Sequence, residues 1–166
     1  MNHITFWQII EEALKNVSTV YDVAPVITKK LQKLPAGEIV SFMQHQNDLM
    51  SESYRHDLWA VAYIINRGCS DDCFEYFRGW LMANGQERWE AAMKAPESIG
   101  EWVNPKEFVY EYEDMLYVAA NAFKAKTEQE FPYDKISINY PQRPLGKSWT
   151  EEELEKLYPD LNTMFT

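Results

Sequence analysis

The sequence lacks any long apolar run. Its longest, residues 58–65, is far shorter than the roughly 20 residues that a helix needs to cross a bilayer. The first ten residues carry no positive region ahead of an apolar stretch, and Glu11 and Glu12 follow at once, so they do not read as a secretory signal. These features predict a cytoplasmic protein that does not act at a membrane.

Cysteine and histidine are also scarce. The chain has two cysteines, Cys69 and Cys73, and three histidines, His3, His45 and His56. In a reducing compartment such a cysteine pair is expected to be two free, packed thiols. No histidine stands at a recognisable ligand spacing, so we expect no metal site.

Positive charge is in deficit. Lys and Arg number 16 against 26 Asp and Glu, which gives a formal net charge of −10. Such a surface repels phosphate backbones and anionic lipids, so we do not expect nucleic acid as a partner. The negative electrostatic field would instead attract a basic protein or a cationic ligand. The chain also has no glycine loop that would cradle phosphate, no dinucleotide fingerprint and no zinc-protease motif, so no cofactor is expected.

Apolar and aromatic residues are plentiful. Of the 166 residues, 46% are hydrophobic and 14% aromatic. A chain of this length buries enough surface to fold as one domain without a disulfide or a metal. We therefore predict a single domain over residues 1–166, with a helical core at 4–127 and an ordered, proline-rich tail at 128–166.

Helical spacing of apolar residues predicts an all-α bundle of about seven helices. Thr5 and Gln8 form a capping box for the first helix, and Ser70 can cap the fifth. Residues 57–67 are apolar nearly all round, as expected of a central, buried helix. The predicted helices cover residues 5–16, 22–34, 35–52, 57–67, 70–84, 85–94 and 105–126, the last of them with a buried stripe of Phe108, Tyr112, Met115, Leu116, Ala119 and Phe123.

The tail differs from the rest in composition. Three prolines and Gly146 punctuate it, and residues 135–140 alternate as a short strand or hairpin would. Thr150 and Glu153 form a capping box for a short last helix that should end at Pro159. The tail is thus expected to be irregular but ordered.

The most informative segment is residues 68–81. On a helix, Phe74, Phe77 and Leu81 share one apolar face. Asp71, Glu75 and Arg78 form a polar stripe nearly opposite to it. One interpretation is structural, because Ser and Asp are what a helix start requires and the aromatics belong to a core. The other is a site, because exposed N–H groups, two carboxylates and an arginine lie close together at a tight turn.

This segment resembles the signature of a bacterial domain-of-unknown-function family, Gly-Cys-Ser-Asp-Asp-x-Phe-x-Tyr-Phe-Arg-x-Trp-Leu. The likeness extends over about residues 4–127 and includes Phe6-Trp7, residues 57–63 and Gly85. Arg67 departs from the small residue that usually precedes the signature glycine. The resemblance supports the helical fold and implies no activity.

Two classes of function follow. The favoured one is a small interaction or regulatory module, for example an inhibitor or immunity-like protein, whose acidic, aromatic-rich surface binds a basic protein. The alternative is an enzyme or a binder of a small ligand or cation. Its pocket would be built from Asp71, Asp72 and Arg78, with Trp59, Trp80 and Glu111 as walls.

A stripe of Glu107, Glu111 and Asp114 would be a solvated acidic face, because a cation site needs further oxygen ligands from elsewhere. His56 and Asp57 would not form a catalytic pair, because neighbours on a helix do not face each other. The sequence leans away from an enzyme but does not decide between the two classes.

Overall fold

The computed structural model describes residues 1–107 and 109–166; Phe108, expected in a buried helical stripe, lies outside the described residues. Over this part of the chain the fold is mainly α, as predicted, and contains no β-sheet. The α-helices are α1 His3–Leu14, α2 Val23–Leu31, α3 Ala36–Glu52, α4 His56–Ile65, α5 Asp71–Ala83, α6 Gln86–Lys94, α7 Val118–Thr127, α8 Glu151–Leu157 and α9 Pro159–Phe165. Short 3-10 helices are η1 Val20–Asp22, η2 Pro96–Glu101, η3 Glu113–Tyr117 and η4 Tyr133–Lys135.

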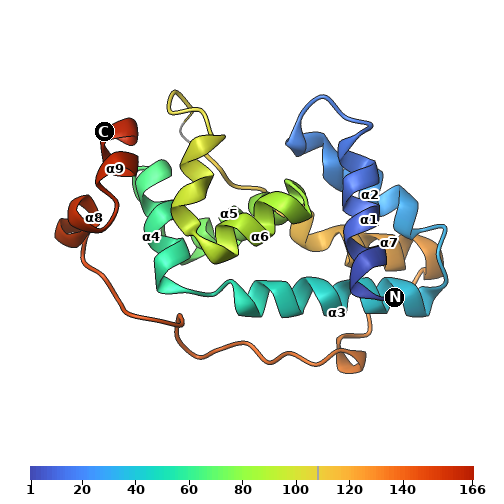
Figure 1. Cartoon of the computed structure of the whole chain (residues 1–166). Coiled ribbons are helices and arrows are strands. Elements are labelled where there is room, and N and C mark those ends of the chain that lie inside the picture. Colours follow the sequence, from blue (N-terminus) through green and yellow to red (C-terminus); the bar gives the residue numbers. More distant parts are fainter. Residues whose placement is uncertain (108) are drawn as a thin grey trace.

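The helices gather at two ends of α3. Helices α1, α2 and α7 pack together at its N-terminal end, while α4, α8 and α9 lie beyond its C-terminal end, and α5 and α6 lie between the two groups (Figure 1). One continuous hydrophobic cluster includes residues from both groups. Helix α4 is buried on most of its circumference, as predicted, although it lies at one end of the molecule and not at its centre (Figure 1). None of the described helices combines the length and apolar character needed to cross a membrane.

Capping explains where several helices begin. The Asn2 side chain accepts a hydrogen bond from the Thr5 N–H at 2.8 Å, so α1 begins at His3 and the predicted cap at Thr5 is wrong. Asn is a strong N-cap, and its position ahead of Thr5 starts the helix earlier. The capping box of Thr150 and Glu153 is confirmed.

The predicted long helix at 105–126 is confirmed only in its last part, where α7 covers Val118–Thr127 and buries Ala119 and Phe123; its first part is wrong. The Asn104 side chain accepts from the Lys106 N–H at 3.0 Å, which makes a local turn instead of a helix start. The Tyr110 hydroxyl donates to the Asn104 carbonyl at 2.6 Å, and the Tyr110 N–H donates to Asn66 Oδ1 at 2.7 Å. These tertiary bonds hold the described part of the segment in an irregular path, so helical structure begins only with η3.

The predicted strand in the tail is not formed. Residues 136–142 are extended or bent, and their neighbour is α3, not another strand. The tail's only β-bridge among the described residues joins Leu145 to Arg55. The helix that Thr150 caps, α8, ends at Leu157 just before Pro159, as predicted. It is not the last helix, because Pro159 begins α9, where a proline at the first position needs no N–H partner.

The two cysteines are joined in a disulfide, so the prediction of free thiols is wrong. Cys69 lies in the turn before α5 and Cys73 lies in its first helical turn, which brings their Cα atoms to 5.2 Å, within the usual range for a bridge. The prediction relied on the expected compartment, whereas the turn geometry decides the pairing.

Candidate functional site

The signature segment forms a tight turn and the start of α5. Arg67 and Gly68 both have positive φ, 55° and 120°, and reverse the chain after α4. Ser70 caps α5 by accepting from the Cys73 N–H at 3.2 Å. Asp71 and Asp72 lie in the first turn and are exposed, where the helix dipole favours negative charge. Their position is fully explained by helix initiation.

Arg78 lies in the interior, although the periodicity placed it on a polar stripe with Asp71 and Glu75. Its side chain is only 2% exposed. Its Nη1 donates to the Met50 carbonyl at 2.6 Å and its Nε donates to the Phe74 carbonyl at 3.1 Å. Among the described residues no carboxylate pairs with it. The prediction of an exposed stripe is therefore wrong at Arg78, because α3 and the tail cover that part of α5.

Three aromatic rings complete the environment of the Arg78 guanidinium. Its carbon lies 4.6 Å from the ring centre of Phe74, 5.2 Å from that of Tyr54 and 5.7 Å from that of Tyr140. Ring faces attract a cation through their quadrupole. Carbonyl groups and rings together replace the water that this buried charge has lost.

The other predicted binding residues do not join Asp71, Asp72 and Arg78 in one pocket. Trp59 is half-buried, stacks on Phe74 with ring centres 4.9 Å apart, and donates to the Cys69 carbonyl at 3.0 Å. Trp80 is 3% exposed and stacks on Trp102 at 5.2 Å. Glu111 lies in the irregular segment before η3, and its charge acts on Tyr21. The aromatic residues of the signature are core.

A different pocket is formed beside α5, where α3, η3 and the tail meet. Its volume is about 230 Å³. Helix α3 contributes Gln46 with Asn47 and two methionines, and α5 contributes Glu75. Tyr117 from η3 and Tyr133 and Tyr140 from the tail form the remaining polar wall. We call this the tyrosine pocket.

Gln46 gives the tyrosine pocket an unmet hydrogen-bonding capacity. The residue is 2% exposed, and its Nε2 donates to the Met115 carbonyl at 3.0 Å. That bond fixes the orientation of the amide, because only the nitrogen can donate to a carbonyl. The Oε1 atom is buried and accepts no hydrogen bond from any described residue. A buried acceptor without a donor costs about 1–3 kcal/mol, and because this oxygen has almost no accessible surface, a donor from outside reaches it only when a neighbouring side chain of the pocket wall moves.

Carboxylate charge acts on two tyrosines of the tyrosine pocket, and the Arg78 guanidinium opposes it at one of them. The charge of Glu113 is the main cause that raises the pKa of Tyr117, with burial second. Burial raises the pKa of Tyr140 and Glu75 raises it further, while the Arg78 guanidinium lowers it by charge and hydrogen bonding. A tyrosine resists ionisation where the field is already negative. The acidic face of α5 thus continues into the pocket.

The chemistry of the tyrosine pocket suits a cationic donor. Glu75 is exposed and makes no ion pair with any described residue. Its carboxylate and Gln46 Oε1 are both acceptors, and tyrosine rings attract cations. An ammonium or guanidinium group meets all three requirements, whereas a carboxylate or phosphate meets none of them.

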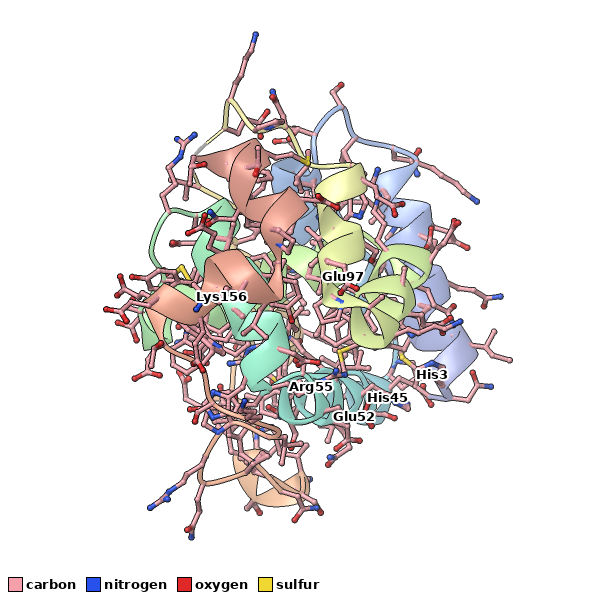
Figure 2. The ribbon with its side chains drawn as sticks, turned by 60° about the vertical axis from the view of Figure 1, so that its left-hand side comes forward. His3, His45, Glu52, Arg55, Glu97 and Lys156 are labelled. Carbon is pink, nitrogen blue, oxygen red and sulfur yellow. A yellow bond between two sulfur atoms is a disulfide. The ribbon has the colours of Figure 1, made fainter. Side chains whose placement is uncertain are left out.

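Another polar face lies at the start of α1 and the end of α6. Figure 2 shows His3, His45, Glu52 and Arg55 from the start of α1 along α3 to the start of α4. His3 accepts from Trp7 Nε1 at 3.1 Å, and the His3 and His45 rings are 6.3 Å apart. A pocket of about 420 Å³ lies there. Within the described part of the chain no three acidic, histidine or cysteine side chains gather to hold a metal.

A further pocket of about 420 Å³ lies between the tail and the start of α4. The arginine at its wall, Arg55, is satisfied within the chain, because it pairs with Asp57 and donates to the Met93 carbonyl at 2.7 Å. Among the described residues, the linings of these two larger pockets hold no buried side-chain polar atom without a partner. The tyrosine pocket is therefore the stronger candidate site.

Sequence reasoning missed Gln46, Tyr117, Tyr133 and Tyr140 as members of one site. They come from three segments that are distant in sequence, and no spacing rule connects them. Glu75 was recognised, but only as part of a surface stripe. A buried polar residue within the apolar face of α3 was the one available signal.

Fold and site together define a mainly α protein with a signature helix built into its core and an acidic tyrosine pocket beside it. The chain belongs to the family described as "Protein of unknown function (DUF4240)", whose family model matches residues 1–125. This confirms the resemblance to a domain-of-unknown-function family. No curated protein and no solved structure matches the chain. The whole tail, including Tyr133 and Tyr140, lies outside the matched segment.

Proposed function

We propose that this protein is a cytoplasmic binding module that docks a basic protein partner by taking a lysine or arginine side chain into the tyrosine pocket. The observation that carries the proposal is that the buried Gln46, whose Oε1 has no partner, and the unpaired Glu75 line the same pocket. Ring faces of Tyr117, Tyr133 and Tyr140 supply the cation–π part of the interaction.

The net charge of −10 supports the same function at longer range. An acidic surface attracts a basic partner before contact and speeds association, and this steering weakens as salt is added. An inhibitor or immunity-like role is one form that such a module could take. The alternative of a pocket built from Asp71, Asp72 and Arg78 has less support, because two of these residues are exposed and the third is in the interior.

The test is a titration with hexalysine and hexaarginine peptides, followed by calorimetry and by NMR shifts of the Tyr117 and Tyr133 backbone amides. Hexaglutamate is the negative control. Glu75→Gln should weaken binding about tenfold or more, because a hydrogen bond to a charged group is worth about 1.5–3 kcal/mol. Gln46→Met should weaken it too while keeping the side-chain length.

Glu87→Gln is the matched control, since Glu87 is an exposed glutamate on α6, remote from the lining of the tyrosine pocket. It removes the same charge from the whole molecule and should leave affinity nearly unchanged at physiological salt. Equal weakening by Glu75→Gln and Glu87→Gln would mean that the peptide responds only to net charge, and would reject the pocket.

A further inference from the structure

The extended tail segment 136–145 lies along α3 and is held mainly through its backbone (Figure 1). The Ser137 N–H donates to Gln44 Oε1 at 2.7 Å, and Gln44 Nε2 donates to the Ser137 carbonyl at 2.9 Å. Ser51 Oγ donates to the Asn139 carbonyl at 2.7 Å. Gln44 and Ser51 are seven residues apart, so they lie on one face of α3 two turns from each other.

The far end of the segment is fixed in the same way. The Leu145 N–H donates to the Tyr54 carbonyl at 2.8 Å, and the His56 N–H donates to the Leu145 carbonyl at 2.9 Å. The apolar support of the segment is uneven: Ile136 packs against the core and the Tyr140 ring packs on Tyr54, whereas Ile138 is 60% exposed and Leu145 is 49% exposed. Segments with few buried apolar contacts open at a lower free energy than the core.

Between these two ends the segment supplies a wall of the tyrosine pocket. The Tyr140 ring packs on Tyr54 with ring centres 5.0 Å apart and lies over the Arg78 guanidinium. When the segment leaves α3, the pocket loses Tyr140 and Arg78 loses one of its three ring contacts. Docking of the segment and completion of the pocket are therefore one event.

We propose that residues 136–145 form a strap that docks on α3 and releases from it as a unit, and that this motion regulates the tyrosine pocket. That the strap regulates cation binding rests on the proposed function, whereas the motion of the strap does not depend on it. A cation bound in the pocket interacts with Tyr140 only while the strap is docked, so it stabilises docking. By reciprocity, loosening the strap lowers the affinity for the cation.

The motion is tested by amide hydrogen exchange, resolved by NMR, in the full chain. The variant is Gln44→Ala with Ser51→Ala, which removes the contacts at one end of the strap. The reporter is the Leu145 amide, which contacts neither residue. Exchange at Leu145 should become about tenfold or more faster, because three hydrogen bonds that favour docking are lost. Gln8→Ala, at an exposed glutamine of α1, is the control.

Unchanged exchange at Leu145 in the double variant would show that the two ends open independently, and would overturn the strap. The strap is also overturned if Leu145 in the wild type exchanges only as slowly as the α4 core amides, since the segment would then open only with global unfolding. A thermal melt of the double variant checks that the fold is retained.

Regulation is tested separately with hexalysine. The peptide should slow exchange at Leu145 in the wild type and should bind the double variant several-fold more weakly, although Gln44 and Ser51 do not line the pocket. Binding of equal strength to both proteins would overturn the regulatory part. If hexalysine does not bind the wild type at all, the proposed function fails, while exchange at Leu145 in the double variant still decides whether the strap exists.

Discussion

Arg78 shows how much a single residue's role depends on what surrounds it. Its guanidinium donates to two backbone carbonyls and lies over three aromatic rings. A shorter side chain would lose the hydrogen bond to the Met50 carbonyl. Asp72 is exposed and interacts with the structure chiefly through the helix dipole. The two residues belong to one signature, yet they contribute to stability by different amounts.

We expect Arg78→Gln to lower the free energy of unfolding by about 2–4 kcal/mol, because it removes two charged hydrogen bonds and three cation–π contacts from the interior. Asp72→Asn should lower it by about 0.3–1 kcal/mol through the lost dipole interaction. Urea denaturation at one pH compares the two. Equal losses would contradict the interior role assigned to Arg78.

Gly79 is required by a close approach. A Cβ atom on Gly79 would lie 2.7 Å from the Tyr112 carbonyl oxygen and 3.2 Å from the Leu116 side chain. Gly79→Ala should therefore destabilise the protein by about 1–3 kcal/mol, as overpacking does. Gly37→Ala is the control, since nothing lies within 4 Å of its Cβ position and alanine favours a helix. Calorimetry should show a lower melting temperature for Gly79→Ala and a higher one for Gly37→Ala. A higher melting temperature for both variants would contradict the close approach at Gly79.

At the scale of an element, α5 is held by its N-terminal turn as well as by its core face. Ser70 caps the helix and the Cys69–Cys73 disulfide ties the turn to it. Both cysteines are 9% exposed, so the bridge is close to the surface but mostly covered. The start of the signature is thus fixed twice, by a cap and by a covalent bond.

Reduction of the disulfide should lower the free energy of unfolding by about 2 kcal/mol or less, because the loop that it closes is short and loop entropy grows with loop length. Thermal melts with and without a phosphine reductant measure the effect. The double variant Cys69→Ala and Cys73→Ala should be insensitive to the reductant. A wild-type melt that does not respond to complete reduction would show that the bridge adds no stability.

For the whole molecule, the acidic surface and the buried tyrosines make stability fall at alkaline pH. Burial, followed by the charge of Glu107, raises the pKa of Tyr21 to about 12, whereas a free tyrosine has a pKa of about 10. Between these values the unfolded chain releases a proton that the folded chain keeps. The contribution of Tyr21 to the free energy of unfolding is therefore complete below pH 10 and is lost as the pH rises towards 12.

The urea midpoint should accordingly drop between pH 10 and 12. Tyr21→Phe should show a smaller drop, although it starts lower because the hydroxyl no longer donates to the Val109 carbonyl. Seven other tyrosines have pKa values raised in the folded state and keep part of the pH dependence in the variant. An identical drop in both proteins would show that Tyr21 is not a source of the effect.

The sequence by itself determined the helical class, the all-round burial of α4, the caps at Ser70 and Thr150, and the family. These follow from local periodicity and capping chemistry, which act over a few residues and leave a readable pattern. It also placed Asp71 and Asp72 correctly at the exposed start of α5.

Only the tertiary structure decided the rest, because the deciding contacts join distant segments. Asn66 and Tyr110 keep the segment before η3 from continuing as a helix. The tail covers α5 and turns a predicted surface arginine, Arg78, into a buried one. The tyrosine pocket exists because Gln46, Glu75 and Tyr140 meet across three elements, and a period along the chain carries no information about such a meeting.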